Sequence, residues 1–358
     1  MGYTVCKPMI AADISLASEK DRSYPMLQLL RMLVALSIFT GHWGEAYVGR
    51  LWPQGQIAID IFFMIEGFLA MGFLSQPTVI SMNRWQIIRS RLVHIYPVYA
   101  IALVVSFCSF APQALANAGG WTITNWVGAF ISGLVLMPFF STLVYGSVFP
   151  LNPPSWAIVL ELFGFALLVC LRVHDAPRRL FVLWIGAAFI YFTLSMMWRD
   201  LNAGWASVHY WGGWPRMILS FAGGAWLRHL HAEYGARTPK IHPVTVLALF
   251  VGMHLPKIHL IGAPLLGIGV PLLVWLGASC PCPAWLETVA AFAKRNTLSI
   301  YLLGYPIMMI WRYANTIFMV PLSFAGSLAG LALVLGSLLV AGMILTYITE
   351  NMTLEREV

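Results

Sequence analysis

The chain has 358 residues, of which 59% are hydrophobic and only 10% are charged. A soluble globular domain carries about 25% charged residues, so this composition excludes a soluble enzyme or binding module. The formal net charge is +7. That surplus does not indicate a nucleic-acid partner, because membrane proteins accumulate Lys and Arg in their cytoplasmic loops. We therefore expect the lipid bilayer, and no nucleic acid, among the partners of the chain.

Apolar stretches that are long enough for a transmembrane helix, or nearly so, recur along the sequence. Crossing the hydrocarbon core takes about 20 apolar residues, and these runs lack the alternation that strands of a membrane barrel show. The sequence thus predicts an all-α, polytopic integral membrane protein. The expected spans are 27–46, 57–77, 92–110, 155–172, 179–197, 213–230, 242–256, 260–278, 297–315 and 325–348.

A further apolar stretch, 121–141, is ambiguous. If it crossed the membrane once, the basic clusters at 172–179 and 228–240 would lie outside the cell, against the preference of Lys and Arg for cytoplasmic loops. The charges therefore favour about ten helices in one bundle, both termini in the cytoplasm, and a re-entrant or interfacial segment near 111–154. Irregular backbone at membrane depth is tolerated only beside a cavity or other protein, which predicts an outward-facing pocket.

We divide the chain into three parts. Residues 1–26 form a charged cytoplasmic segment without an apolar core, so we expect no cleaved signal peptide. Residues 27–350 form the transmembrane domain, and residues 351–358 form a cytoplasmic tail. The five cysteines include the pair Cys280 and Cys282, which lacks a second ligand pair at zinc spacing. We predict no metal site.

Arg31 and His42 are the most informative residues, because both lie in an otherwise almost wholly apolar stretch. Eleven steps along a helix return to within about 20° of the starting direction. The guanidinium and the imidazole therefore project from one face, about 16 Å apart along the helix axis. Ionisable groups in hydrocarbon are costly and usually mark a pathway or a reaction site, so we look for the function along this face.

Three carboxylates lie in later apolar stretches. Asp60 and Glu66 are six residues apart, which turns a helix by about 240°, so we expect them to have different partners. Asp60 is either an interfacial or capping residue or part of the site. Glu66 either pairs with an arginine or helps form a pocket, because a buried carboxylate must pair or stay protonated. Glu161 is expected to face the bundle interior, where it orients His42, contacts a ligand or neutralises Arg31.

Arginines mark both ends of the predicted bundle. Arg89 and Arg91 precede the third span on its cytoplasmic side. They act either as topology signals that contact lipid phosphates or as ligands of a phosphate-rich cytosolic molecule such as acyl-coenzyme A. At the opposite end, Trp156 opens the fourth span and suits the membrane interface, and Arg216 enters the sixth span, where an anionic or sugar ligand is one interpretation.

Taken in order, these segments resemble the acyltransferase type 3 family, whose members are membrane acyltransferases that modify envelope and exported carbohydrates. The first helix of that family carries an Arg, ten residues and then a His, as at Arg31 and His42. Its other motifs are similar to residues 58–68, 89–99, 156–161, 216–224, 299–306 and 347–350. The resemblance therefore spans nearly the whole chain.

The chain departs from the family pattern at four positions. Gln28 stands where the family usually has Asp, and Glu66 replaces a small Ser. His94 replaces an Arg, and Gly304 replaces a frequent His. We carry family roles only onto positions that match.

The resemblance implies transfer of an acyl group, most often acetyl, from cytosolic acyl-coenzyme A to a hydroxyl of a carbohydrate or glycolipid. Acyl-coenzyme A is then a co-substrate, and no permanently bound cofactor is expected. Under this hypothesis Arg31, with Arg91 and Arg89, holds the donor. The implied location is the bacterial inner membrane, while the acceptor sugar, the acyl chain length and the oligomeric state stay open.

The catalytic residues under this hypothesis centre on His42, which acts as general base on the sugar hydroxyl. Glu161 or Asp60 would fix its tautomer and stabilise the imidazolium. A covalent acyl-histidine intermediate is an alternative course. The residues expected to contact the acceptor are Trp156, Arg216 and Glu66.

Two other classes of protein explain the same features. A secondary transporter or proton-coupled exporter also places ionisable residues inside helices, although the two halves of this chain show no repeat. A non-catalytic partner of a polysaccharide assembly complex would leave His42 dispensable.

Overall fold

The computed structural model describes residues 24–173, 176–198, 201–255, 264–281 and 283–354. Within these residues the regular structure is helical, apart from one antiparallel bridge between Ser147 and Ala206. The all-α prediction is confirmed. Residues 1–23 of the predicted cytoplasmic segment, residues 260–263 of the eighth predicted span and residues 355–358 of the predicted tail lie outside the described residues.

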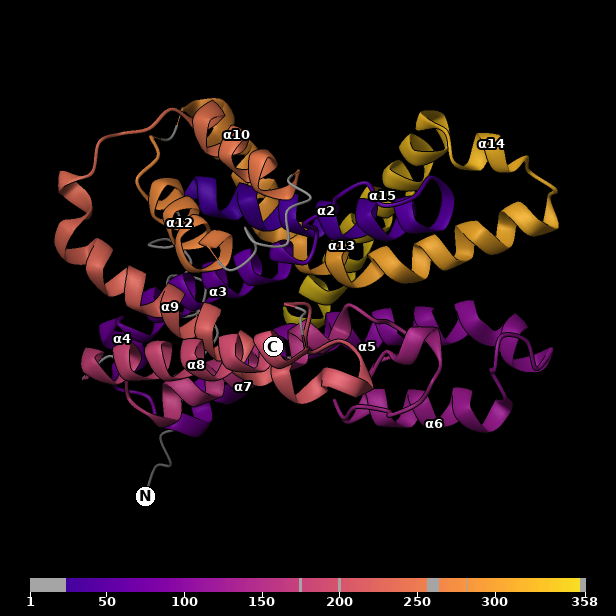
Figure 1. Cartoon of the computed structure of the whole chain (residues 1–358), viewed down its shortest axis with the longest axis horizontal. Coiled ribbons are helices and arrows are strands. Elements are labelled where there is room, and N and C mark those ends of the chain that lie inside the picture. The colour runs from indigo at the N-terminus through magenta and orange to yellow at the C-terminus, as the bar shows by residue number, and fades with distance from the viewer. Residues whose placement is uncertain (1–23, 174–175, 199–200, 256–263, 282, 355–358) are drawn as a thin grey trace, which may run out of the picture.

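A helix lies at each of the predicted spans (Figure 1). In chain order the helices are α2 (Pro25–Tyr47), α3 (Ile57–Leu74), α5 (Arg84–Leu115), α7 (Ser155–Cys170), α8 (Pro177–Trp198), α9 (Gly213–Tyr234), α10 (Pro243–His254), α12 (Val270–Ala278), α13 (Ala284–Ile317) and α15 (Leu328–Leu354). Shorter elements join them: α4 (Pro77–Ile80), α6 (Ile123–Leu134), η2 (Val144–Gly146), η3 (Ser207–Gly212), η4 (Gly235–Arg237), η6 (Leu265–Gly269) and α14 (Leu322–Ala325).

Five helices of the described chain are long and apolar enough to cross a membrane, namely α2, α3, α5, α8 and α15. Helices α7 and α10 are apolar but have only 16 and 12 residues, and α9 and α13 carry several charged side chains. The apolar helices indicate an integral membrane protein. The count of ten spans stays a prediction.

The region predicted to be re-entrant folds back on α5. Helix α6 runs antiparallel to α5: the Trp126 ring stacks on Phe107 with centroids 3.8 Å apart, and the Tyr99 hydroxyl donates to the Gly133 carbonyl at 2.8 Å. With 12 residues, α6 is about 18 Å long, which is shorter than the hydrocarbon core of about 30 Å. Residues 135–154 follow mostly without regular helix. The depth of this hairpin in the bilayer stays a prediction.

Local sequence signals fix the starts of two helices that carry site residues. Pro25 begins α2, where the missing N–H of proline has no intrahelical partner to lose. Asn83 caps α5: its side chain accepts from the Gln86 backbone N–H at 2.9 Å, and its own N–H donates to the Gln86 side chain at 3.0 Å. Arg31 and Arg91 therefore both lie in the second turn of their helices.

Helices α3 and α9 approach so closely that glycine is required where they cross. A Cβ at Gly67 would lie 1.9 Å from the carbonyl oxygen of Phe221, and one at Gly224 would lie 1.9 Å from that of Met64. Small residues allow such backbone contact between membrane helices. The contact holds α3, which is almost wholly buried and carries two of the predicted site carboxylates, inside the bundle.

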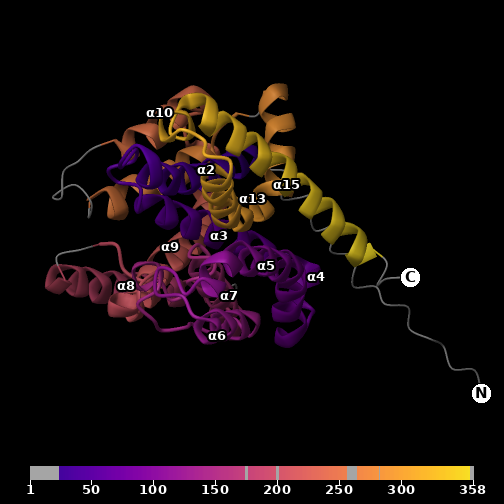
Figure 2. The same cartoon turned by 90° about the vertical axis from the view of Figure 1, so that its right-hand side faces the viewer.

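The helices form two halves. Helices α4, α5, α6, α7 and α8 lie together on one side, and α2, α10, α13, α14 and α15 lie on the other (Figures 1 and 2). Helices α3 and α9 lie between them. Contacts between α13 and α5 and between α3 and α7 join the halves, and the candidate site lies along this junction.

Candidate active site

Four charged side chains from four helices meet at the junction. Arg31 of α2 forms an ion pair with Glu66 of α3, with Nε 2.5 Å from Oε1. Nη2 of Arg91 on α5 lies 2.8 Å from Oε2 of Glu66 and also contacts the carboxylate of Glu161 on α7. Gln28 accepts a hydrogen bond of 2.8 Å from Nη1 of Arg31. We call Arg31, Glu66, Arg91 and Glu161 the arginine–glutamate cluster.

The two kinds of side chain in this cluster differ in burial. The carboxylates of Glu66 and Glu161 are 3% and 2% exposed, whereas the side chains of Arg31 and Arg91 are 16% and 27% exposed. Each buried carboxylate has an arginine partner, as the cost of burying an unpaired charge requires. Nε of Arg91 is buried and has no hydrogen-bond partner among the described residues. The arginines are thus the more exposed members of the cluster, and the carboxylates that neutralise them are buried.

Beside the cluster lies a cavity of about 830 Å³. Its lining comes from α2, α3, α5, α7, α13 and α15, and it includes all four members of the arginine–glutamate cluster together with His94. The apolar part of the wall includes Phe62, Phe73 and Phe165. A volume of this size lies within the range of small-molecule and cofactor sites.

Further charges lie where the cavity reaches exposed residues. Lys294 and Arg295 of α13 line it there, beside Glu287 and Glu350. Arg295 is paired with Glu350 of α15, with Nε 2.9 Å from Oε1. The starts of α2, α5 and α13 lie at this end of the bundle, which the loop charges predict to be cytoplasmic.

His42 lies three turns beyond Arg31 on α2, outside this cavity. Its side chain is 35% exposed, and Nδ1 lies 3.8 Å from Oε2 of Glu45. The imidazole makes an edge-to-face contact with the ring of Tyr305, with centroids 5.7 Å apart. On its buried side His42 borders a second, much smaller pocket of about 10 Å³.

Tyr301 of α13 lines both the large cavity and the small pocket. The Tyr301 hydroxyl donates to the carbonyl of Pro154 at 2.8 Å. Its ring stacks on Phe62 with centroids 5.8 Å apart and planes 6° apart. The arginine-lined cavity and the pocket of His42 thus share this aromatic residue.

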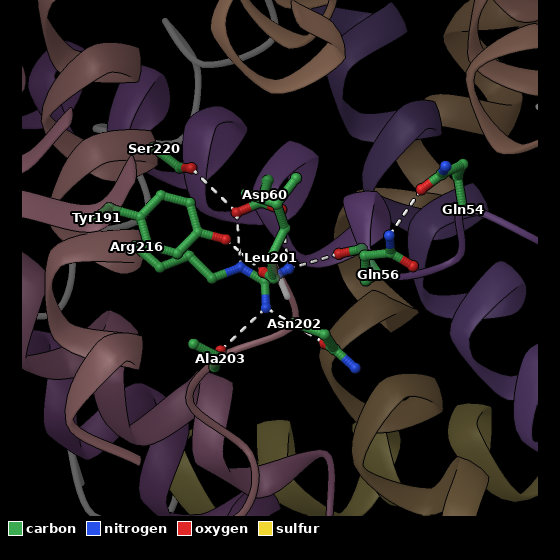
Figure 3. A network of polar contacts seen from close by, with 9 residues as sticks. All are labelled: Gln54, Gln56, Asp60, Tyr191, Leu201, Asn202, Ala203, Arg216 and Ser220. Atoms are coloured by element: carbon green, nitrogen blue, oxygen red, sulfur yellow. Dashed lines mark hydrogen bonds and ion pairs between the residues drawn. The ribbon is translucent and has the colours of Figure 1, made fainter. Parts of the chain in front are cut away.

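A second ion pair, Asp60 with Arg216, is fully buried (Figure 3). Nε and Nη2 of Arg216 donate to the two carboxylate oxygens of Asp60 at 2.9 and 2.8 Å. The guanidinium also donates to the carbonyls of Gln56 and Ala203 at 2.7 and 3.0 Å, and Ser220 donates to Asp60 at 3.3 Å. This pair joins α3, α9 and the loop before η3.

The family model described as an acyltransferase domain matches residues 25–348. The chain belongs to the acyltransferase type 3 family. The match covers the arginine–glutamate cluster, His42 and the cavity lining apart from Thr349 and Glu350. The family makes the protein a membrane acyltransferase. Comparisons with curated proteins and with solved structures gave no match.

In this acyltransferase the two residues predicted to orient His42 have other partners. Glu161 is held by Arg91, and Asp60 is held by Arg216. Among the described residues, the ionic partner of His42 is Glu45 instead. The prediction that Asp60 and Glu66 have different partners is confirmed.

The residues predicted to contact the acceptor differ in their surroundings. Arg216 has no exposed surface with which to touch a sugar. Trp156 is 6% exposed and packs against the ring of Phe63, with centroids 6.0 Å apart. Glu66 follows the salt-bridge alternative, since it pairs with arginines at the cavity base. Arg216 and Trp156 are thus packed within the bundle, whereas Glu66 lines the cavity beside its arginine partners. Contact of these residues with an acceptor stays a prediction.

Among the predicted donor ligands, Arg31 and Arg91 line the cavity, but Arg89 is exposed and lies outside its lining. The sequence analysis did not single out Lys294 and Arg295 as site residues. Their place one or two turns before residues 299–306, which resemble a family motif, was the available signal. Glu45 was also missed, although its spacing of three residues from His42 places both on one helix face.

Proposed function

We propose that this acyltransferase moves an acyl group from acyl-coenzyme A, bound in the arginine-lined cavity, to a hydroxyl of a carbohydrate or glycolipid that reaches His42 from the opposite side. The observation that carries the proposal is the neighbourhood of the two spaces. A cavity of about 830 Å³ is lined by Arg31, Arg91, Lys294 and Arg295, and its lining residue Tyr301 also lines the pocket of His42.

The cavity suits a donor with phosphates at one end and a thioester at the other. Lys294 and Arg295 at the mouth provide charge for phosphate groups, which bind strongly to guanidinium and ammonium N–H donors. Arg31 and Arg91 lie deeper, where buried carboxylates fix their orientation. The Arg91 side chain is 27% exposed and lines the cavity there.

His42 acts in this proposal as the general base. It takes the proton of the acceptor hydroxyl while the oxygen attacks the thioester carbonyl, and imidazole performs this task near neutral pH. The new C–O ester bond forms, the C–S bond breaks, and the proton passes from the imidazolium to the leaving thiolate. Glu45 lies close enough to stabilise the imidazolium. A two-step course through an acyl-imidazole uses the same residues.

The direct test uses purified protein in liposomes with labelled acetyl-coenzyme A and extracted glycans. We expect label in the glycan, and a loss of about 10²-fold or more in His42→Ala, because a general base contributes 10²–10⁴-fold. His229→Ala, a half-buried histidine of α9 away from the cavity, is the matched control and should keep the wild-type rate. Transfer that continues unchanged in His42→Ala would refute the assignment of the base.

Cysteine accessibility tests whether donor and acceptor approach His42 from opposite sides of the membrane. Ala116→Cys and Ala176→Cys, made in a background without the native cysteines, lie in the loops after α5 and before α8. The proposed topology expects an impermeant thiol reagent to label position 116 from outside and position 176 from inside. The opposite pattern would overturn the approach of donor and acceptor from opposite sides.

A further inference from the structure

Under the proposed function the acyl carbonyl and the acceptor hydroxyl react beside His42, which borders a small pocket. It lies between α2 and α13, with His42 on one side and Tyr301 on another. The rest of its lining is mainly apolar and includes Phe39, Gly304 and Met308. A hydroxyl bound by His42 can attack only a carbonyl that reaches this space.

The pocket is very small and its walls are firmly packed. Its volume of about 10 Å³ is close to the minimum needed for one water molecule, and a methyl group has a similar size. Phe39 and Met308 are 4% and 3% exposed, so their neighbours hold them in place. A Cβ at Gly304 would lie 3.3 Å from Cδ2 of Phe39, which shows that even one added methyl group crowds the pocket.

We propose that this pocket receives the end of the acyl chain and that Met308, with Tyr301, sets the upper limit of acyl length at the acetyl group. The inference rests on the proposed function. Tyr301 lines the pocket as well as the donor cavity, and its hydroxyl donates to the carbonyl of Pro154. Met308 closes the pocket one turn beyond Gly304. A longer chain has to displace one of these packed side chains.

The first test is the donor profile of the wild-type protein in liposomes with glycan acceptor. We expect kcat/KM to fall by roughly tenfold or more for each methylene added from acetyl- to propionyl- to butyryl-coenzyme A, as is typical of a closed apolar pocket. Equal rates with acetyl- and hexanoyl-coenzyme A would overturn the inference and leave the proposed function intact. Absence of transfer from every acyl-coenzyme A would instead refute the proposed function.

The second test compares two neighbouring methionines of α13. Met308 lines the pocket, whereas Met309 is also buried but does not line it. We expect Met308→Ala to raise the butyryl-to-acetyl ratio of kcat/KM by roughly tenfold, and Met309→Ala to leave the ratio unchanged. The ratio is measured within one preparation, so partial loss of folded protein does not alter it. An equal change in both variants, or no change in Met308→Ala, would overturn the assignment.

Gly304→Ala changes the pocket in the opposite direction. The added methyl group meets Phe39 and should lower the propionyl-to-acetyl ratio further while it slows acetyl transfer. A ratio that rises in this variant would contradict the inference even if Met308→Ala fails to fold.

Discussion

Two clusters of charge lie inside this helical bundle, and they differ in what surrounds them. Asp60 and Arg216 are 1% and 0% exposed, and the guanidinium is hydrogen-bonded to a carboxylate and to backbone carbonyls (Figure 3). The arginine–glutamate cluster has equally buried carboxylates, but Arg31 and Arg91 face a cavity. The same residue types therefore support the fold in one cluster and present donors to a ligand in the other.

Charge alone therefore does not distinguish a structural from a functional ionisable group in a membrane helix. The distinguishing feature is whether protein partners already occupy all the hydrogen-bonding positions of the group. We call Asp60 with Arg216 the closed pair, because breaking it leaves a buried charge without compensation. The arginine–glutamate cluster is the open cluster, in which water or a ligand in the cavity can compensate a lost contact.

Removing one partner of the closed pair should have the largest effect. We expect Asp60→Ala to lower the free energy of unfolding by about 3–5 kcal/mol, because Arg216 is then buried without its counter-charge. Thermal unfolding in detergent measures this. The double variant Asp60→Ala with Arg216→Leu removes both charges and should regain part of the loss. A single variant as stable as the wild type would contradict a structural role for the pair.

The same substitution in both clusters sharpens the comparison. Lysine keeps the charge of arginine but loses its planar fork. We expect Arg216→Lys to lower stability by about 1–3 kcal/mol, because buried acceptors lose their donors. Arg91→Lys should keep most of the folded yield and raise KM for acyl-coenzyme A by about tenfold, since each 1.4 kcal/mol corresponds to tenfold. Equal stability losses with an unchanged KM would remove the distinction between the clusters.

Arg31 offers a smaller test inside the open cluster. Gln28 and Glu66, two positions that depart from the family pattern, both contact this one guanidinium. We expect Glu66→Ser to lower kcat/KM severalfold, because Arg31 loses its carboxylate. Adding Gln28→Asp returns a carboxylate to the same arginine and should restore part of the activity. A double variant no better than Glu66→Ser would show that the two positions are not linked through Arg31.

The smallest effect is expected at the cavity mouth. Arg295 and Glu350 form an exposed ion pair, and such pairs contribute only about 0–1 kcal/mol to stability. Arg295→Gln should therefore leave thermal unfolding nearly unchanged but raise KM for acyl-coenzyme A modestly, and more at low salt than at high salt. An effect that does not depend on ionic strength would speak against a role in attracting phosphate groups.

The sequence predicted the helices well and the partners of their charged residues poorly. Apolar runs and the eleven-residue spacing placed Arg31 and His42 on one helix face, and the six-residue spacing separated Asp60 from Glu66. Periodicity gives the direction of a side chain but not the helix that faces it. That Asp60 meets Arg216 follows from the glycine-dependent crossing of α3 and α9, in which residues more than 150 positions apart come together.

The same limit applies to the site. The three-turn spacing of Arg31 and His42 along α2 could be predicted, but not that Tyr301 of α13 lines both the cavity and the pocket of His42. Lys294 and Arg295 looked like ordinary loop charges, because only the packing of α13 against α5 and α15 turns them toward the cavity. Those contacts are tertiary and leave no local pattern.

The most direct test of the account is photo-crosslinking with a light-activated analogue of acetyl-coenzyme A, with the labelled peptides identified by mass spectrometry. The account predicts label on the cavity-lining turns of α5 and α13, around Arg91 and Lys294, and its loss when excess acetyl-coenzyme A is present. Label confined to other helices, or label that acetyl-coenzyme A does not displace, would contradict the claim that this cavity holds the acyl donor.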